Sequence, residues 1–288
     1  MKIAVCGCSW SSRDIAYPDL EFGKLIADYY DADYINLGKP ACSNPGIALQ
    51  IDYLLDGKMG SLPDLVIINA TTVTRTELKL IPKRRFNPKD TWDNVAFNMM
   101  LGEKFRDEHA PGYGKGYDPS IVVDSYSTIF GEDMTKKLGE GHFHSRYEDV
   151  FTPASYEALK KWFLYFFDAD IERYKQQMIL LGACLKLKKK GVKFIFCPNT
   201  FDWAEDLHVL HEHTQPTEFP EKAVTWETFE NDELLYSGIA ESLHLADEIY
   251  GSWDKSPGTA IDNHLPVECH MDFAYKVISH INRYDLAK

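Results

Sequence analysis

The feature that most constrains the fold is a series of short apolar runs that alternate with segments of helical periodicity. The apolar runs Lys2–Cys8, Tyr34–Leu37 and Asp64–Ala70 predict three strands. Between them, Phe22–Tyr30 and Asn44–Leu55 carry apolar residues at helical spacing and predict two helices. Strands joined by helices in this order form a parallel sheet with right-handed crossovers. Because the runs are apolar throughout and do not alternate, both faces of the sheet are expected to be covered.

The same pattern returns in the second half of the chain. Helical periodicity from Ser155 to Lys190 predicts one long helix or two, and Val192–Cys197 predicts a fourth strand. Two further helices are expected at Glu233–Leu245 and at Cys269–Arg283.

Two irregular segments interrupt this alternation. Residues 78–151 and 199–232 show no clear period and are expected to be insertions over the carboxyl edge of the sheet. No internal repeat or linker divides the chain, so we expect a single domain over residues 1–288 with these two insertions. The expected architecture is α/β, a three-layer α/β/α sandwich around a central parallel sheet of about five strands.

Composition excludes several classes of function. The formal net charge is -13, which repels phosphate backbones and anionic membranes, so we expect neither nucleic acid nor a membrane as a partner. Polar residues follow the first apolar run at once and leave no room for a secretion signal. The six cysteines include no C-x-x-C pair and favour reduced thiols in a cytoplasmic protein. No dinucleotide or Walker motif is present, and no cofactor is expected.

Residues able to carry chemistry follow the predicted strands, where ligands of parallel sheets bind. Ser9 comes directly after the first strand, and Asp262 and His264 come shortly before the last helix. A serine hydroxyl becomes an effective nucleophile when a histidine takes its proton and a third group orients that histidine. The turn after the second strand offers a backbone N–H for a developing oxyanion. The sequence therefore contains a candidate Ser/His/Asp triad.

At these residues the chain resembles the SGNH (GDSL-like) hydrolase family, in particular its compact phage-type members. Gly7-Cys8-Ser9 is similar to the Gly-x-Ser of the family's first block, and Pro40–Asn44 is similar to the turn of the second, with Ala41 in place of the usual Gly. Asp262-Asn263-His264 is similar to the Asp-x-x-His of the fourth block but is one residue shorter. The resemblance implies a flavodoxin-like α/β fold, with Ser9 as nucleophile, His264 as base and Asp262 as the residue that orients it.

The third block departs from the family pattern. The family has Gly-x-Asn-Asp after the third strand, whereas this chain has Asn69-Ala70-Thr71-Thr72. The expected oxyanion donors are the backbone N–H groups of Ser9 and Ala41, together with the side chain of Asn69 or Thr71. The expected substrate-binding residues are Trp10, Ser43, Asn44 and Arg75.

Structural alternatives exist for these assignments. Ser9 also fits a turn-capping role, and Ser43 and Asn44 fit the cap of the second predicted helix. Trp10 also suits core packing, and Arg75 a surface ion pair.

Other histidines fit a catalytic or metal-binding role less well. His270 is a rival base, but its place at the start of the last helix suits packing or capping better. A further group lacks the ligand spacing typical of zinc, so no metal is expected there: His208, His211, Glu212 and His213.

Two functions follow from this sequence. The first is an esterase or deacylase that acts on a small acyl ester or an acylated carbohydrate. The second is a non-catalytic SGNH-like structural or carbohydrate-binding module of a phage-type particle, which the altered third block and the large insertions favour. The expected partner is a small-molecule or glycan ester, and the oligomeric state stays open.

Overall fold

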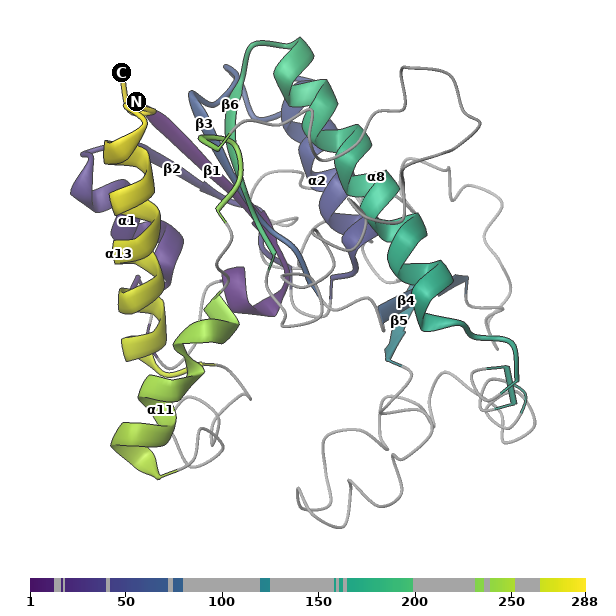
Figure 1. Cartoon of the computed structure of the whole chain (residues 1–288). Helices are drawn as coiled ribbons and strands as arrows, with labels where there is room; N and C mark the ends of the chain where they lie inside the picture. Colours follow the sequence, from purple (N-terminus) through teal and green to yellow (C-terminus); the bar gives the residue numbers. More distant parts are fainter. Residues whose placement is uncertain are drawn as a thin grey trace.

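A parallel sheet forms the centre of the structure. The computed structural model describes residues 1–12, 17, 19–39, 42–71, 75–79, 120–124, 158, 161–162, 165–198, 231–235, 239–251 and 265–288. Within these residues the main sheet has four strands in the order β2-β1-β3-β6 (Figure 1). They are β1 (Lys2–Gly7), β2 (Asp33–Asn36), β3 (Leu65–Asn69) and β6 (Lys193–Cys197). The predicted parallel α/β arrangement is confirmed.

The register brings the carboxyl ends of the strands to one edge of the sheet. All three pairings are parallel, and Gly7 pairs with Asn69, which pairs with Cys197. On the other side of β1, Val5 pairs with Asn36 at the end of β2. Residues that directly follow these strands therefore lie near one another, as the sequence predicts.

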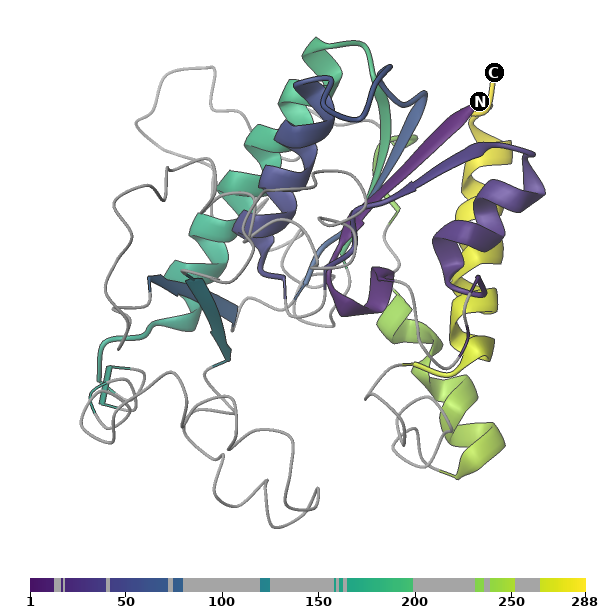
Figure 2. The same cartoon turned by 180° about the vertical axis from the view of Figure 1, so that it is seen from behind.

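Helices pack against both faces of the sheet because successive side chains of each strand point in opposite directions. Ala4 and Cys6 of β1 belong to a core with α2 (Asn44–Leu55) and α8 (Ala169–Lys189). Ile3 and Val5 belong to a second core with α1 (Phe22–Tyr29) and α13 (Val267–Arg283). Figures 1 and 2 show these two pairs of helices on opposite sides of the strands. The described strands thus contribute side chains to two separate cores, each shared with helices.

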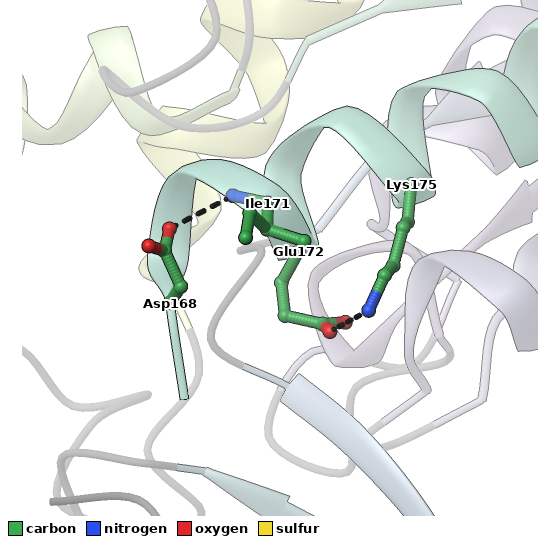
Figure 3. A network of polar contacts seen from close by, with 4 residues as sticks. All are labelled: Asp168, Ile171, Glu172 and Lys175. Carbon is green, nitrogen blue, oxygen red and sulfur yellow. Dashed lines mark hydrogen bonds and ion pairs between the residues drawn. The ribbon is translucent and has the colours of Figure 1, made fainter. Parts of the chain in front are cut away.

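Local sequence explains where two of these helices begin. Ser43 caps α2, since its Oγ accepts a hydrogen bond from the Gly46 N–H at 3.2 Å, and Pro45 lies in the first turn. Asp168 precedes α8, and its Oδ1 accepts from the Ile171 N–H at 3.0 Å (Figure 3). One turn further on, Glu172 forms an ion pair with Lys175 on the same helix at 2.7 Å. Residues 169–189 thus form one continuous helix.

The helix predicted over Glu233–Leu245 is wrong in its first part. The Phe196 N–H donates to the Glu233 carbonyl at 2.9 Å, and the Leu235 N–H donates to the Phe196 carbonyl at 3.0 Å. Leu234 thereby makes a single parallel bridge to β6. The open edge of β6 offers backbone partners that compete with helix formation. The helical part starts later, as η3 (Ile239–Ser242) and α11 (Leu243–Tyr250).

The sequence gives no signal for a second, small sheet. Strands β4 (Arg75–Lys79) and β5 (Ser120–Asp124) pair antiparallel within the region around the first predicted insertion. Most of the two predicted insertions, 78–151 and 199–232, lies outside the described residues. The sheet of about five strands stays a prediction, as does the single domain with two insertions. Of the helices in the described ranges, none has the length and apolar character needed to cross a membrane.

Candidate functional site

Ser9 lies at the carboxyl edge of the sheet, directly after β1. It begins the 3-10 turn η1 (Ser9–Ser11) and is half-buried. Its carbonyl accepts from the Ser12 N–H at 3.1 Å and from Ser12 Oγ at 2.7 Å. Its own hydroxyl makes no hydrogen bond to any residue that the structure describes. The turn is thus held by bonds to the Ser9 carbonyl, and none of the described residues competes for the Ser9 hydroxyl.

The turn is also held through Ser11, which sequence reasoning did not identify. Asn69 Nδ2 donates to Ser11 Oγ at 2.8 Å, and both side chains are buried. Side chains at Gly7 and Gly38 would collide with this arrangement. A Cβ at Gly7 would overlap Ser11 Oγ, and a Cβ at Gly38 would lie 2.5 Å from the Ser11 carbonyl carbon. Glycine at both positions lets η1 pack directly onto the strand ends.

A buried glutamine on α2 completes the end of β1. Gln50 Oε1 accepts from the Gly7 N–H at 2.8 Å, and Gln50 Nε2 donates to the Gly7 carbonyl at 3.1 Å. The Lys39 N–H donates to the same carbonyl at 3.1 Å. Gln50 was missed, although it is a polar residue at helical spacing from Ile47 and Leu54 on the buried face of α2. An amide on an otherwise apolar helix face signals a buried backbone partner.

A second carboxamide holds the residues after β3. Asn44 Nδ2 donates to the Thr71 carbonyl at 2.9 Å, and Asn44 Oδ1 accepts from the Thr71 N–H at 2.8 Å. Asn44 Nδ2 also donates to Gln176 Oε1 on α8 at 2.7 Å. Both Asn44 and Ser43 are fully buried, and the capping alternative is confirmed for Ser43. The Asn44 side chain does not cap the helix but bonds Thr71 and Gln176. Their substrate-binding role stays a prediction.

The other predicted residues divide into described and undescribed positions. Trp10 is partly buried and contacts both cores, and Thr71 is buried. The remaining predicted positions lie outside the described residues: Ala41, Asp262, His264, the side chain of Arg75, and the group His208, His211, Glu212 and His213.

His270 occupies the packing position that the sequence favours for it. It is buried on α13, and its Nδ1 accepts from the Phe22 N–H at 3.4 Å. Its ring is stacked on the Phe22 ring, with the centroids 6.3 Å apart. These contacts fix His270 between α1 and α13. Since α13 begins at Val267, position 264 precedes the helix, as expected for a base carried by a loop.

Burial determines which nucleophiles this edge can offer. Full burial raises the pKa of the Cys6 thiol far above its usual value, and the nearby Cys42 raises it further. A thiol in that state does not supply a thiolate at neutral pH. The same edge carries a buried carboxylate, that of Glu21. Its Oε1 accepts from Asn36 Nδ2, at the end of β2, at 3.5 Å. Burial raises the pKa of the Tyr34 hydroxyl, and the charge of Glu21 adds to that shift.

The candidate site therefore consists of a half-buried serine on a turn at the end of β1, which buried amides hold through Gly7 and Ser11. In the part of the chain that the structure describes, no cluster of three or more His, Cys, Asp or Glu side chains is arranged to hold a metal ion. Comparison of the chain with protein-family models, with curated proteins and with solved structures gives no match.

Proposed function

We propose that the protein is a serine hydrolase of the SGNH type that acts as an esterase or deacylase. Ser9 Oγ attacks the acyl carbonyl, His264 takes the serine proton, and Asp262 orients the histidine ring. The acyl group passes to Ser9 as the alcohol leaves, and water then releases it as the acid. The substrate is a small acyl ester or an acylated carbohydrate, with Trp10 and Arg75 as candidate contacts to it.

The position of Ser9 carries this proposal. A serine at the carboxyl edge of a parallel sheet lies where such sheets bind ligands. Asn69 holds its turn through Ser11, and Gln50 holds the strand end just before the turn, while the Ser9 hydroxyl makes no hydrogen bond to the described residues. A nucleophile needs this combination, because a fixed backbone holds the attacking atom in place and a free hydroxyl can meet the base.

Oxyanion stabilisation is assigned mainly to backbone groups. The Ser9 N–H makes no hydrogen bond to the described residues and lies beside the reacting oxygen by covalent connection. We assign the second donor to the Ala41 N–H, with the side chain of Thr71 as a further candidate. Backbone donors do not depend on the Gly-to-Ala difference at position 41, which leaves the N–H in place.

The proposal extends to the architecture and location. The whole chain is proposed to form a three-layer α/β/α sandwich with about five strands, to which the bridge at Leu234 adds a fifth position beside β6. We place the protein in the cytoplasm, and the state of its thiols supports this. All six cysteines fall in the described ranges, all are buried, and none forms a disulfide bond.

Labelling with a fluorophosphonate probe tests the proposal directly. Wild-type protein should be labelled on Ser9, and Ser9→Ala should remove the label. Ser61→Ala is the matched control, since the Ser61 hydroxyl interacts with Lys2 near the amino end of β1, remote from η1. Labelling of Ser9→Ala at the wild-type rate would contradict the assignment. Failure of the wild type to react would favour a non-catalytic SGNH-like module instead, and glycan-binding measurements would then test that alternative.

A further inference from the structure

Ser11 and Asn69 link the turn that carries Ser9 to the end of β3. Their side chains meet at 2.8 Å, with 1% and 0% of the two residues exposed. Asn69 Oδ1 has no hydrogen-bond partner among the described residues, so within them the bond to Ser11 is the polar anchor of this amide. The link survives exchange of the amide oxygen and nitrogen, because a hydroxyl both donates and accepts. Solvent does not reach it.

Packing around Ser11 leaves its side chain little freedom. Gly7 and Gly38 approach it so closely that neither position has room for a Cβ. Ser11 and Ser9 also belong to the same three-residue turn, and the Ser11 N–H donates to the carbonyl of Cys8, the residue before the turn, at 3.0 Å. Any displacement of Ser11 therefore displaces the backbone that carries Ser9.

We propose that Asn69 and Ser11 act together as positioning residues that set the place of the Ser9 turn, and that Asn69 affects the reaction through Ser11. This inference rests on the proposed function for its catalytic part. It distinguishes this chain from a site in which an asparagine side chain donates directly to the oxyanion. Here the amide is committed to a buried hydroxyl of the nucleophile turn before any substrate binds.

A double-mutant cycle separates these two roles. We compare Ser11→Ala, Asn69→Ala and the double variant for the rate of fluorophosphonate labelling and for ester hydrolysis. Each single variant should lower the labelling rate and kcat by about 10- to 100-fold with KM little changed, since a small misplacement of a reacting group has this effect. The double variant should be no slower than the singles, because both remove the same contact.

Hydrogen exchange gives a readout that does not depend on activity. The amides of residues 8–12 should exchange faster in all three variants and to the same extent. Val277→Ala is the control for general destabilisation, because Val277 is buried on α13 in the second core. It should lower the stability of the protein without changing exchange at residues 8–12 relative to the rest of the sheet.

The outcomes are distinct. Normal labelling of Ser11→Ala with loss of labelling in Asn69→Ala would overturn the inference and make Asn69 a direct donor. Unchanged exchange at residues 8–12, or additive effects in the double variant, would also overturn it. If the wild type is not labelled, the proposed function fails, and the exchange cycle alone still decides whether the two residues position the turn.

Discussion

Gln50 allows a sharp test of how the end of β1 is stabilised. The substitution Gln50→Met keeps the length and nearly the volume of the side chain but removes both hydrogen bonds to Gly7. The Gly7 carbonyl keeps the Lys39 N–H as a donor, whereas the Gly7 N–H loses its acceptor inside the protein. The dominant loss is therefore one buried, unsatisfied backbone N–H.

The expected magnitude follows from that count. An orphaned buried N–H costs about 1–3 kcal/mol, and a small gain from the more apolar methionine offsets part of this. We expect the free energy of unfolding to fall by about 2 kcal/mol. For a chain of 288 residues this corresponds to a drop in Tm of roughly 3 °C. Urea unfolding followed by circular dichroism measures the free energy, and a thermal scan measures Tm.

Gln177 provides the matched control. It is also buried, with 1% of the residue exposed, but neither atom of its amide has a hydrogen-bond partner in the described part of the chain. Gln177→Met therefore removes a buried amide that makes no hydrogen bond to the described residues, and stability should stay equal or rise. If both substitutions lowered stability by the same amount, the bonds between Gln50 and Gly7 would not be the cause, and the reasoning would be refuted.

Two further predictions concern histidines. His264→Ala should lower kcat by several orders of magnitude, as the loss of a triad base does. His270→Ala should mainly lower Tm, because it leaves a cavity beside Phe22. Steady-state kinetics and thermal scans measure the two effects, and the reverse pattern would place the base on His270. Burial lowers the pKa of His280 from 6.5, although the contact between its Nε2 and the Asp232 carbonyl at 2.9 Å acts in the opposite direction. The unfolded chain therefore binds this proton at a higher pH than the folded protein does. The stability that neutral His280 contributes is thus present above pH 6.5 and is lost as the pH falls through the pKa of the folded state. Urea unfolding at several pH values measures this dependence, and His280→Gln should make the free energy of unfolding less dependent on pH below 6.5. An unchanged slope would exclude His280 as the source of the dependence.

The sheet was predictable from sequence because its strands are buried on both faces. The predicted ends of β1, β3 and β6 differ from the observed ones by at most one residue, since a continuous apolar run marks a buried strand directly. The bounds of α2 agree with the prediction because its cap and its proline are local signals. The bridge at Leu234 was not predictable, because it depends on the open edge of β6 and not on the sequence around it.

The candidate site divides in the same way. The place of Ser9 follows from a glycine at the end of an apolar run, which is a local pattern. Gln50 and Ser11 were missed because their partners Gly7 and Asn69 are 43 and 58 residues away in the sequence. A carboxamide side chain that bonds a backbone group far away in the sequence has no periodic signature. Only its polarity on an otherwise apolar helix face distinguishes it.

The strand order has a consequence for synthesis on the ribosome. β3 lies between β1 and β6, yet β6 is translated more than a hundred residues after it. At a translation rate of about 5–20 residues per second, one edge of β3 stays unpaired for on the order of ten seconds before β6 is synthesised. The waiting segment is Leu65-Val66-Ile67-Ile68-Asn69, an apolar strand with unpaired backbone groups of the kind that promotes aggregation. Protection of this nascent edge, for example by a chaperone, is therefore expected to govern the yield of folded protein.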